Sequence, residues 1–256
     1  MTSSRLDAPA ARWALAIVAH LALLLAWYLF VKLGDVPRFV MPSPADTLGS
    51  LAVGDYGWFD NALVTAAEIF GGYFLALGVG VALALAFTWS RTLEALVLPL
   101  LVTLNMIPKV ALGPLIIVWF KYGVFPNTMM AFSIAVFPIL LNTAKGLRET
   151  EPELLDLVRS LRGNRWQLFT KIQLPGSLPY VFAGMKVAAI LAVAGAIVGE
   201  FLGSDQGLGY LMLQVQVMLD TPAMFMAVIL ITLIGMALYG LVLLAERLLV
   251  VKDARL

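Results

Sequence analysis

The sequence has no cysteine and a single histidine among its 256 residues, and only 13% of its residues are charged. The absence of cysteine excludes a disulfide scaffold, a thiolate zinc site and a cysteine nucleophile. With 17 basic and 16 acidic residues, the net charge of +1 provides no basic surface for nucleic acid. The sequence also contains no cluster of His, Asp and Glu that would suggest a metal site.

Apolar residues are abundant instead, at 61% of the chain, with a mean hydropathy of +0.94. Soluble domains average about 45–50% apolar and about 25% charged residues. A soluble protein of this size needs far more polar surface, and a disordered chain needs far less apolar surface. The composition therefore predicts an integral membrane protein.

Six apolar runs are long enough to cross a bilayer as helices, which requires roughly 20 residues each. They cover residues 13–31, 62–89, 95–120, 128–144, 177–201 and 223–249. The third run contains Pro99, Pro108 and Pro114, which predict a kinked or broken helix. We expect an all-α protein with about six transmembrane helices.

The distribution of lysine and arginine predicts the orientation. With residues 1–12 placed inside, twelve of the 17 basic residues fall on the inner side, three on the outer side and two within spans. Because basic residues concentrate in cytoplasmic segments, we expect both termini in the cytoplasm. The chain 1–256 then forms a single transmembrane domain, with outer loops at 32–61 and 203–221 and an inner loop at 145–176. In the first outer loop, Ser43, Pro44 and Asp46 predict a short helix over 44–53.

The inner loop at 145–176 carries the most informative pattern. Residues 150–153 form a capping box that starts a helix, and 162–163 end that helix. One face of the helix is apolar and comprises Leu154, Leu155, Leu157, Val158 and Leu161. A second cap at 164–167 predicts another short helix that ends before Leu174-Pro175. On this pattern alone, the loop either lies on the inner leaflet as an amphipathic helix or docks to a cytoplasmic partner.

Residues 153–175 resemble the EAA loop of ABC-importer permeases, with the closest likeness to the nitrate/sulfonate/taurine-type branch. Other motifs agree in order and spacing: Pro42-Ser43-Pro44, Ile107-Pro108-Lys109, Phe137-Pro138, Leu141-Asn142-Thr143, Gly199-Glu200-Phe201-Leu202-Gly203 and Gly207-Leu208-Gly209-Tyr210. The resemblance covers nearly the whole chain. It implies the fold of a type I importer permease with a cytoplasmic coupling-helix loop.

The same resemblance implies the partners. Such permeases work in the bacterial inner membrane as dimers, here a homodimer, with two cytoplasmic ATPase subunits and a periplasmic substrate-binding protein. ATP and Mg belong to the ATPase subunits, and the permease itself has no cofactor and is not an enzyme. Consistent with this division, the sequence contains no Gly-x-x-x-x-Gly-Lys-Ser/Thr phosphate-binding loop.

The loop departs from the family pattern at two places. Asp156-Leu157-Val158 stands where the family has Glu-Ala-Ala, and the usual glycine falls on Arg162, with Gly163 one place later. This shift predicts a reshaped turn. The resemblance assigns contact with the ATPase to Glu153, Asp156, Leu157, Val158, Arg159, Arg162, Gly163 and Arg165.

Four polar residues in the spans are candidates for the translocation pathway or for intramembrane polar contacts: Glu68, Lys109, Asn142 and Glu200. Glu68 and Lys109 both fall in the outer half of the membrane. They either form an ion pair or are satisfied separately by backbone carbonyls near the prolines. Lys186, in the inner half of its span, is expected to extend to the cytoplasmic surface.

Gly195, Gly199 and Gly203 repeat every four residues in the fifth span. Small residues at this spacing let membrane helices approach closely. Their ridge packs either within the chain or against the second copy, along the substrate path.

Glu68 also bears on the substrate through the resemblance. Anion-importing relatives often have Arg at this place, whereas relatives thought to move pyrimidine, thiamine-precursor or riboflavin-like compounds more often have Glu, followed by Ile-Pro-Lys. This favours a neutral or heterocyclic solute, with an anion such as sulfonate, taurine, nitrate or bicarbonate as the alternative. A secondary transporter is the alternative from another class, and such proteins often show two homologous halves.

Overall fold

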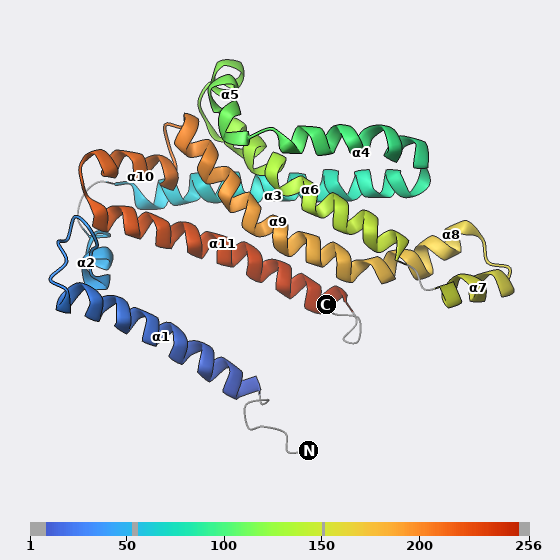
Figure 1. Ribbon diagram of the computed structural model, residues 1–256, viewed down its shortest axis with the longest axis horizontal. Coiled ribbons are helices and arrows are strands. Elements are labelled where there is room, and N and C mark those ends of the chain that lie inside the picture. Colours follow the sequence, from blue (N-terminus) through green and yellow to red (C-terminus); the bar gives the residue numbers. More distant parts are fainter. Residues whose placement is uncertain (1–8, 53–55, 150–151, 251–256) are drawn as a thin grey trace. The chain divides into compact units, whose positions relative to one another are not determined.

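The computed structural model describes residues 9–52, 56–149 and 152–250, and every regular element in these ranges is helical (Figure 1). The chain divides into two compact units. Unit 1 holds the chain up to Trp58 together with Leu211–Ile229, and unit 2 holds Phe59–Tyr210 together with the chain from Leu230.

Unit 1 contains α1 (Pro9–Leu33), the short α2 (Pro44–Gly49), most of α10 (Leu208–Val217) and the start of α11 (Thr221–Leu249). The predicted cap of α2 is confirmed, because Ser43 and Asp46 form a capping box. The helix is shorter than predicted, since it ends at Gly49. The Ser43 hydroxyl donates to Asp46 at 2.6 Å, and this bond is the main reason that the pKa of Asp46 is lowered.

Aromatic and hydroxyl side chains tie the segments of unit 1 together. The indole of Trp27 on α1 donates to the carbonyl of Pro42 at 3.0 Å and stacks on Phe225 of α11. The phenol of Tyr56 donates to Asp220 at 2.7 Å, and this bond raises the pKa of Tyr56. Indole and phenol groups pack through their apolar bodies while their polar atoms keep a hydrogen bond.

Four helices are long and apolar enough to cross a membrane: α3 (Trp58–Trp89), α6 (Val124–Arg148), the continuous helix Arg165–Gly203 that contains α9 (Leu174–Gly203), and α11. They correspond to the second, fourth, fifth and sixth predicted spans. Each begins before its apolar run, by two to four residues in α3, α6 and α11 and by twelve in Arg165–Gly203, because helical hydrogen bonding continues into polar ends such as Asp60. The first span is α1, with 25 residues.

The third predicted span is broken, which confirms the expectation drawn from its prolines. It consists of α4 (Arg91–Met106), the 3-10 turn η2 (Lys109–Leu112) and α5 (Gly113–Phe120). The break falls at Ile107, which takes an extended conformation before Pro108. A residue that precedes proline is driven out of the helical region by a clash with the proline ring.

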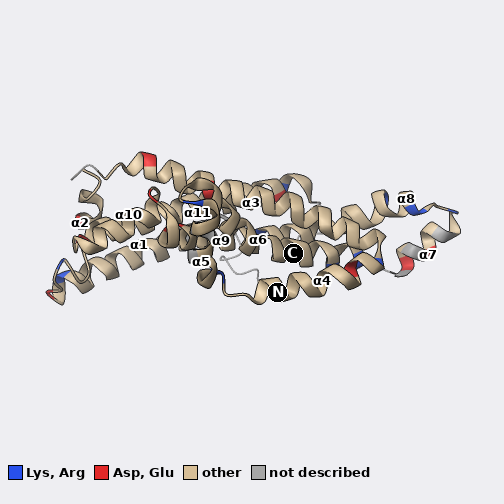
Figure 2. Cartoon of the chain, turned by 90° about the horizontal axis from the view of Figure 1, so that it is seen from above, with Lys and Arg blue, Asp and Glu red and all other residues tan. Residues whose placement is uncertain are grey.

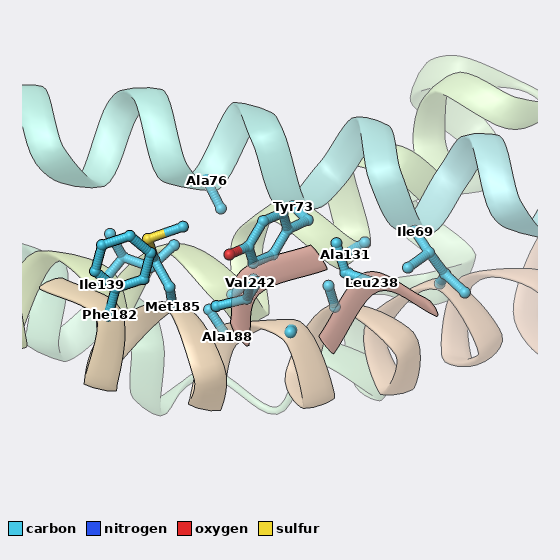
Figure 3. Packing of buried hydrophobic residues seen from close by; sticks show 14 of the residues in the cluster. Ile69, Tyr73, Ala76, Ala131, Ile139, Phe182, Met185, Ala188, Leu238 and Val242 are labelled. Atoms are coloured by element: carbon cyan, nitrogen blue, oxygen red, sulfur yellow. The ribbon is translucent and has the colours of Figure 1, made fainter. Parts of the chain in front are cut away.

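The core of unit 2 lies where α3, α6, α9 and the later part of α11 meet. Figure 3 shows Tyr73 of α3 among small and branched residues of the other helices. Glycines permit this packing. A Cβ at Gly72 would lie 2.5 Å from the Cβ of Ala131, and a Cβ at Gly195 would lie 2.7 Å from the Cα of Ala131. The backbones of α3, α6 and α9 therefore approach more closely than any larger residue at these positions would allow.

Candidate functional site

The loop between α6 and α9 holds the α-helix α7 (Pro152–Ser160), and it is where charged residues gather. Figure 2 shows few coloured residues along the long helices and a group of them at α7 and α8 (Arg165–Leu168). Glu153, Asp156 and Leu157 are exposed on α7. The start of the predicted capping box, Thr150 and Glu151, lies outside the described residues, and the side chain of Arg159 does so as well.

The turn after α7 keeps the geometry of a glycine-ended helix although its residues are shifted. Arg162 adopts a left-handed conformation with φ of 53°, and the amide of Gly163 donates to the carbonyl of Val158 at 2.8 Å. This six-residue closure is a Schellman motif, whose left-handed position is usually glycine. At Gly163 a Cβ would lie 2.6 Å from the Val158 side chain. The reshaped turn expected from the shifted glycine is therefore not seen: the helix ends regularly, with Arg162 in the left-handed conformation and Gly163 at the close contact with Val158.

The second cap is confirmed, because Asn164 and Gln167 form a reciprocal capping box. The prediction that this helix ends before Leu174-Pro175 is wrong. Instead α8 continues through a π-helical stretch, η3 (Phe169–Gln173), into α9. Pro175 has no amide hydrogen and its ring crowds the preceding turn, and the wider π turn accommodates it without a break.

A small groove lies beside this turn, between α7 and η3. Its volume is about 290 Å³, and it is lined by Leu157, Val158, Leu161, Gly163, Gln167, Lys171 and Ile172. The lining is largely apolar, with Lys171 and Gln167 as polar members.

Lys109 lies apart from Glu68, and the ion pair considered between them is not formed. The Lys109 ammonium donates to the carbonyl of Leu104 at 3.0 Å. Pro108 cannot supply the usual helical amide donor to that carbonyl, which accepts instead from the amide of Ile107 at 3.4 Å and from the lysine. Lys109 also lines a cavity of about 190 Å³, together with the polar side chains of Asn105 and Ser133 and apolar residues of α3, α4 and α6.

Glu68 and Glu200 lie together in the interior, with exposed fractions of 0% and 1%. Asn127 of α6 donates to Glu68 at 2.8 Å, and Thr65 of α3 donates to Glu200 at 2.6 Å. Glu68 therefore does not line the cavity that holds Lys109. Asn142, the fourth candidate, donates to the carbonyl of Pro138 within its own helix.

The three predicted packing glycines are buried in α9. Gly195 lies against Ala131 and Gly199 against Asn127, both on α6. These contacts are within one chain. They hold Asn127 next to α9 and so help to position it beside Glu68.

Two ion pairs in unit 2 were missed by sequence reasoning. Lys186 of α9 bonds to Glu246, near the end of α11, at 2.9 Å, and its side chain is 20% exposed. Arg148, at the end of α6, pairs with Glu94 of α4. The only sequence signal was that opposite charges fall at similar depths of different spans, which does not specify a pair.

Among the described residues, no group of three or more acidic or histidine side chains is placed to hold a metal ion.

Comparisons with known proteins identify the family and agree with the fold. Residues 75–251 match the model of the family described as binding-protein-dependent transport system inner membrane component. The chain is 37% identical over 239 residues to the riboflavin transport system permease protein RibX of Chloroflexus aurantiacus, covering 93% of this chain and 89% of that protein. It is 34% identical over 217 residues to a probable ABC transporter permease protein of Haemophilus influenzae, covering 85% and 89%.

A third relative is the formylaminopyrimidine transport permease protein ThiX of Halalkalibacterium halodurans, 31% identical over 216 residues, covering 84% of this chain and 86% of that protein. In fold, the chain resembles a chain of the inward-facing MetNI methionine ABC transporter with a TM-score of 0.55 and 19% identity, covering 71% of this chain and 93% of that one. The extent of these matches places the protein in the cytoplasmic membrane as a multi-pass permease. The chain belongs to the family of binding-protein-dependent transport system inner membrane components, the permease subunits of ABC transporters.

Proposed function

We propose that the chain works as a homodimer in an ATP-driven importer, with two ATPase subunits on the cytoplasmic side and a substrate-binding protein on the periplasmic side. The observation that carries this proposal is the capped loop from α7 to α8 in a chain of this family. ATP and Mg would bind the ATPase subunits, and this chain would form the membrane pathway. In this arrangement both termini of the chain lie in the cytoplasm.

The second half of the loop is part of the same continuous helix as α9 and would move with it as a rigid body. Because α8 continues through η3 into α9, a displacement of the loop is transmitted directly to a membrane-spanning helix. The exposed Glu153, Asp156 and Arg165 offer polar contacts to the ATPase, and the groove beside Gly163 accepts an apolar side chain. We assign ATPase contact to this surface, including Leu157, Val158, Arg159 and Arg162.

The substrate we propose is a small heterocyclic compound of the pyrimidine, thiamine-precursor or riboflavin-like class. Two relatives support it by name, at 37% and 31% identity, whereas a putative aliphatic sulfonates transport permease protein of Bacillus subtilis is 25% identical. The electrostatic argument from Glu68 is weaker than the sequence suggested, because this side chain is fully buried. The cavity at Lys109, with Asn105 and Ser133, is the part of the pathway that we expect the solute to meet.

Uptake into proteoliposomes that contain the chain, its ATPase and its binding protein tests this function. The uptake of riboflavin, formylaminopyrimidine, taurine and nitrate is measured one solute at a time. ATP is placed either inside or outside the vesicles. We expect uptake of a heterocycle that requires the binding protein and ATP on the ATPase side. Uptake of taurine or nitrate alone would support the anion alternative, and uptake driven by an ion gradient without ATP would point to a secondary transporter.

Lys109→Met tests the pathway, with Lys121→Met, a change at an exposed lysine that does not line this cavity, as the control. We expect the first variant to lower the uptake rate and the second to leave it unchanged. Equal uptake by both variants would remove Lys109 from the pathway.

A further inference from the structure

The two buried glutamates of unit 2 form a pair without a cation. Thr65, which donates to Glu200, lies one helical turn before Glu68 on α3, and Asn127, which donates to Glu68, packs on Gly199 next to Glu200. Over the ranges that the structure describes, neither carboxyl has a lysine or arginine partner. Two ionised carboxylates repel strongly when they lie side by side away from water, so full ionisation of both is unfavourable.

Glu200 is surrounded by donors. Thr65 donates to its Oε1 at 2.6 Å, and the backbone amides of Gly209 and Tyr210 donate to its Oε2. The direction of the Thr65 hydroxyl is fixed, because its oxygen accepts the amide hydrogen of Leu208 at 2.8 Å. Each contact thus presents hydrogen to an oxygen of Glu200, which is the environment of an ionised carboxylate.

Glu68 lacks a donor at one oxygen. Its Oε1 accepts from Asn127, whereas its buried Oε2 has no hydrogen-bond partner. A buried acceptor without a partner costs roughly 1–3 kcal/mol. A hydrogen on this carboxyl would turn the unpartnered oxygen into a hydrogen-bond donor, and the neighbouring Glu200 carboxylate is an acceptor.

We propose that the cluster is a proton-binding site, in which one proton is carried by Glu68 and donated as a hydrogen bond to Glu200. The pair then holds one negative charge rather than two. That charge lies on Glu200, where Thr65 and the two backbone amides stabilise it.

The charge on Glu200 also holds the segment from Gly207 to Tyr210 in place. Gly207 has φ of 107° and donates to Asn61 at 2.8 Å, and Glu200 fills the space where a Cβ of Gly207 or Gly209 would lie. The segment Gly207-Leu208-Gly209-Tyr210 thus packs around the Glu200 carboxylate and donates two backbone hydrogen bonds to it. The proton on Glu68 allows that carboxylate to stay ionised in the interior.

A sodium ion would fit the cluster poorly. Such a cation requires several oxygen ligands, but Thr65, Asn127, Gly209 and Tyr210 all direct hydrogens toward the glutamates.

The test compares Glu68→Gln with Glu200→Gln in the full chain, purified in lipid nanodiscs at neutral pH. Glutamine at 68 replaces the O–H by an N–H, so we expect its Tm to match that of the unchanged protein. Glutamine at 200 must turn an NH₂ group toward other donors, and we expect it to lower Tm by roughly 4–8 °C. Glu153→Gln, at an exposed glutamate, is the control and leaves Tm unchanged.

Infrared spectroscopy of the same samples detects the proton directly. We expect the carbonyl stretch of a protonated carboxylic acid in the unchanged protein and in Glu153→Gln, and its loss in Glu68→Gln. The proposal is overturned if the band is absent, or if it persists in Glu68→Gln. The proposal is also overturned if the Tm of Glu68→Gln is as low as that of Glu200→Gln, or if the Tm of the unchanged protein differs between sodium and potassium buffers.

Discussion

Removing one partner of the Lys186–Glu246 pair is expected to destabilise the protein far more than removing both. The ammonium and carboxylate lie 2.9 Å apart, and their side chains are 20% and 8% exposed. With an effective dielectric constant of about 20, two unit charges at this distance attract by roughly 6 kcal/mol. Desolvation of both groups offsets much of that attraction, so the net value of the pair is small.

Lys186→Met leaves Glu246 as an uncompensated buried charge, which costs about 3–5 kcal/mol. Glu246→Leu leaves Lys186 unpaired and costs a similar amount. The double variant Lys186→Met/Glu246→Leu removes both charges and keeps side-chain volume, so we expect its stability within about 1–2 kcal/mol of the unchanged protein.

Reversible unfolding of the chain in mixed micelles, followed by circular dichroism, measures these free energies. A positive coupling energy of several kcal/mol in the double-mutant cycle is the expected result. If each single variant costs less than about 1 kcal/mol, or if the double variant is as unstable as their sum, the pair is not the buried interaction that the structure shows.

Three further outcomes are expected. Arg162→Gly relieves the left-handed conformation and slows hydrogen exchange at the end of α7 by about fivefold, equivalent to about 1 kcal/mol; unchanged exchange would contradict this. Gly195→Ala costs about 1–3 kcal/mol because α6 is in the way, whereas Gly176→Ala, which meets no atom, is neutral or stabilising; equal unfolding midpoints would contradict this. Because the pKa of Asp46 is lowered, its ionised carboxylate stabilises α2 at pH values above the unfolded pKa of Asp, and this stabilisation is lost as the pH falls through the folded pKa. Ser43→Ala should therefore make hydrogen exchange in α2 less dependent on pH.

The sequence predicts the features that depend on neighbouring residues. Apolar run lengths located the spans, the three prolines of the third span predicted that it is kinked or broken, and the 164–167 cap located the start of α8. Arg162 shows the limit of such rules, because glycine propensity argues against a left-handed arginine while the packing of Val158 on Gly163 requires the turn. Local preference is weaker than tertiary contact at that position.

The pairing of buried charges depends on how helices are rotated against one another, and hydropathy carries no information on that. Glu68 was considered with Lys109 because both fall at a similar depth, yet Glu68 faces Asn127 and Glu200. Lys186 similarly faces Glu246, which lies 60 residues away in sequence. The partner of a buried charge was the part of the candidate site that sequence reasoning placed wrongly.

The most direct test of the proposed function is the coupling of ATP hydrolysis to uptake when the α7 surface is changed. Asp156→Lys reverses one charge at this exposed position, and Glu149→Lys, a reversal at an exposed residue just before the loop helix, is the matched control. Both variants should reach the membrane at normal levels. The account predicts that Asp156→Lys alone abolishes uptake and the stimulation of ATP hydrolysis by the loaded binding protein, whereas normal ATP-driven uptake by Asp156→Lys would contradict it.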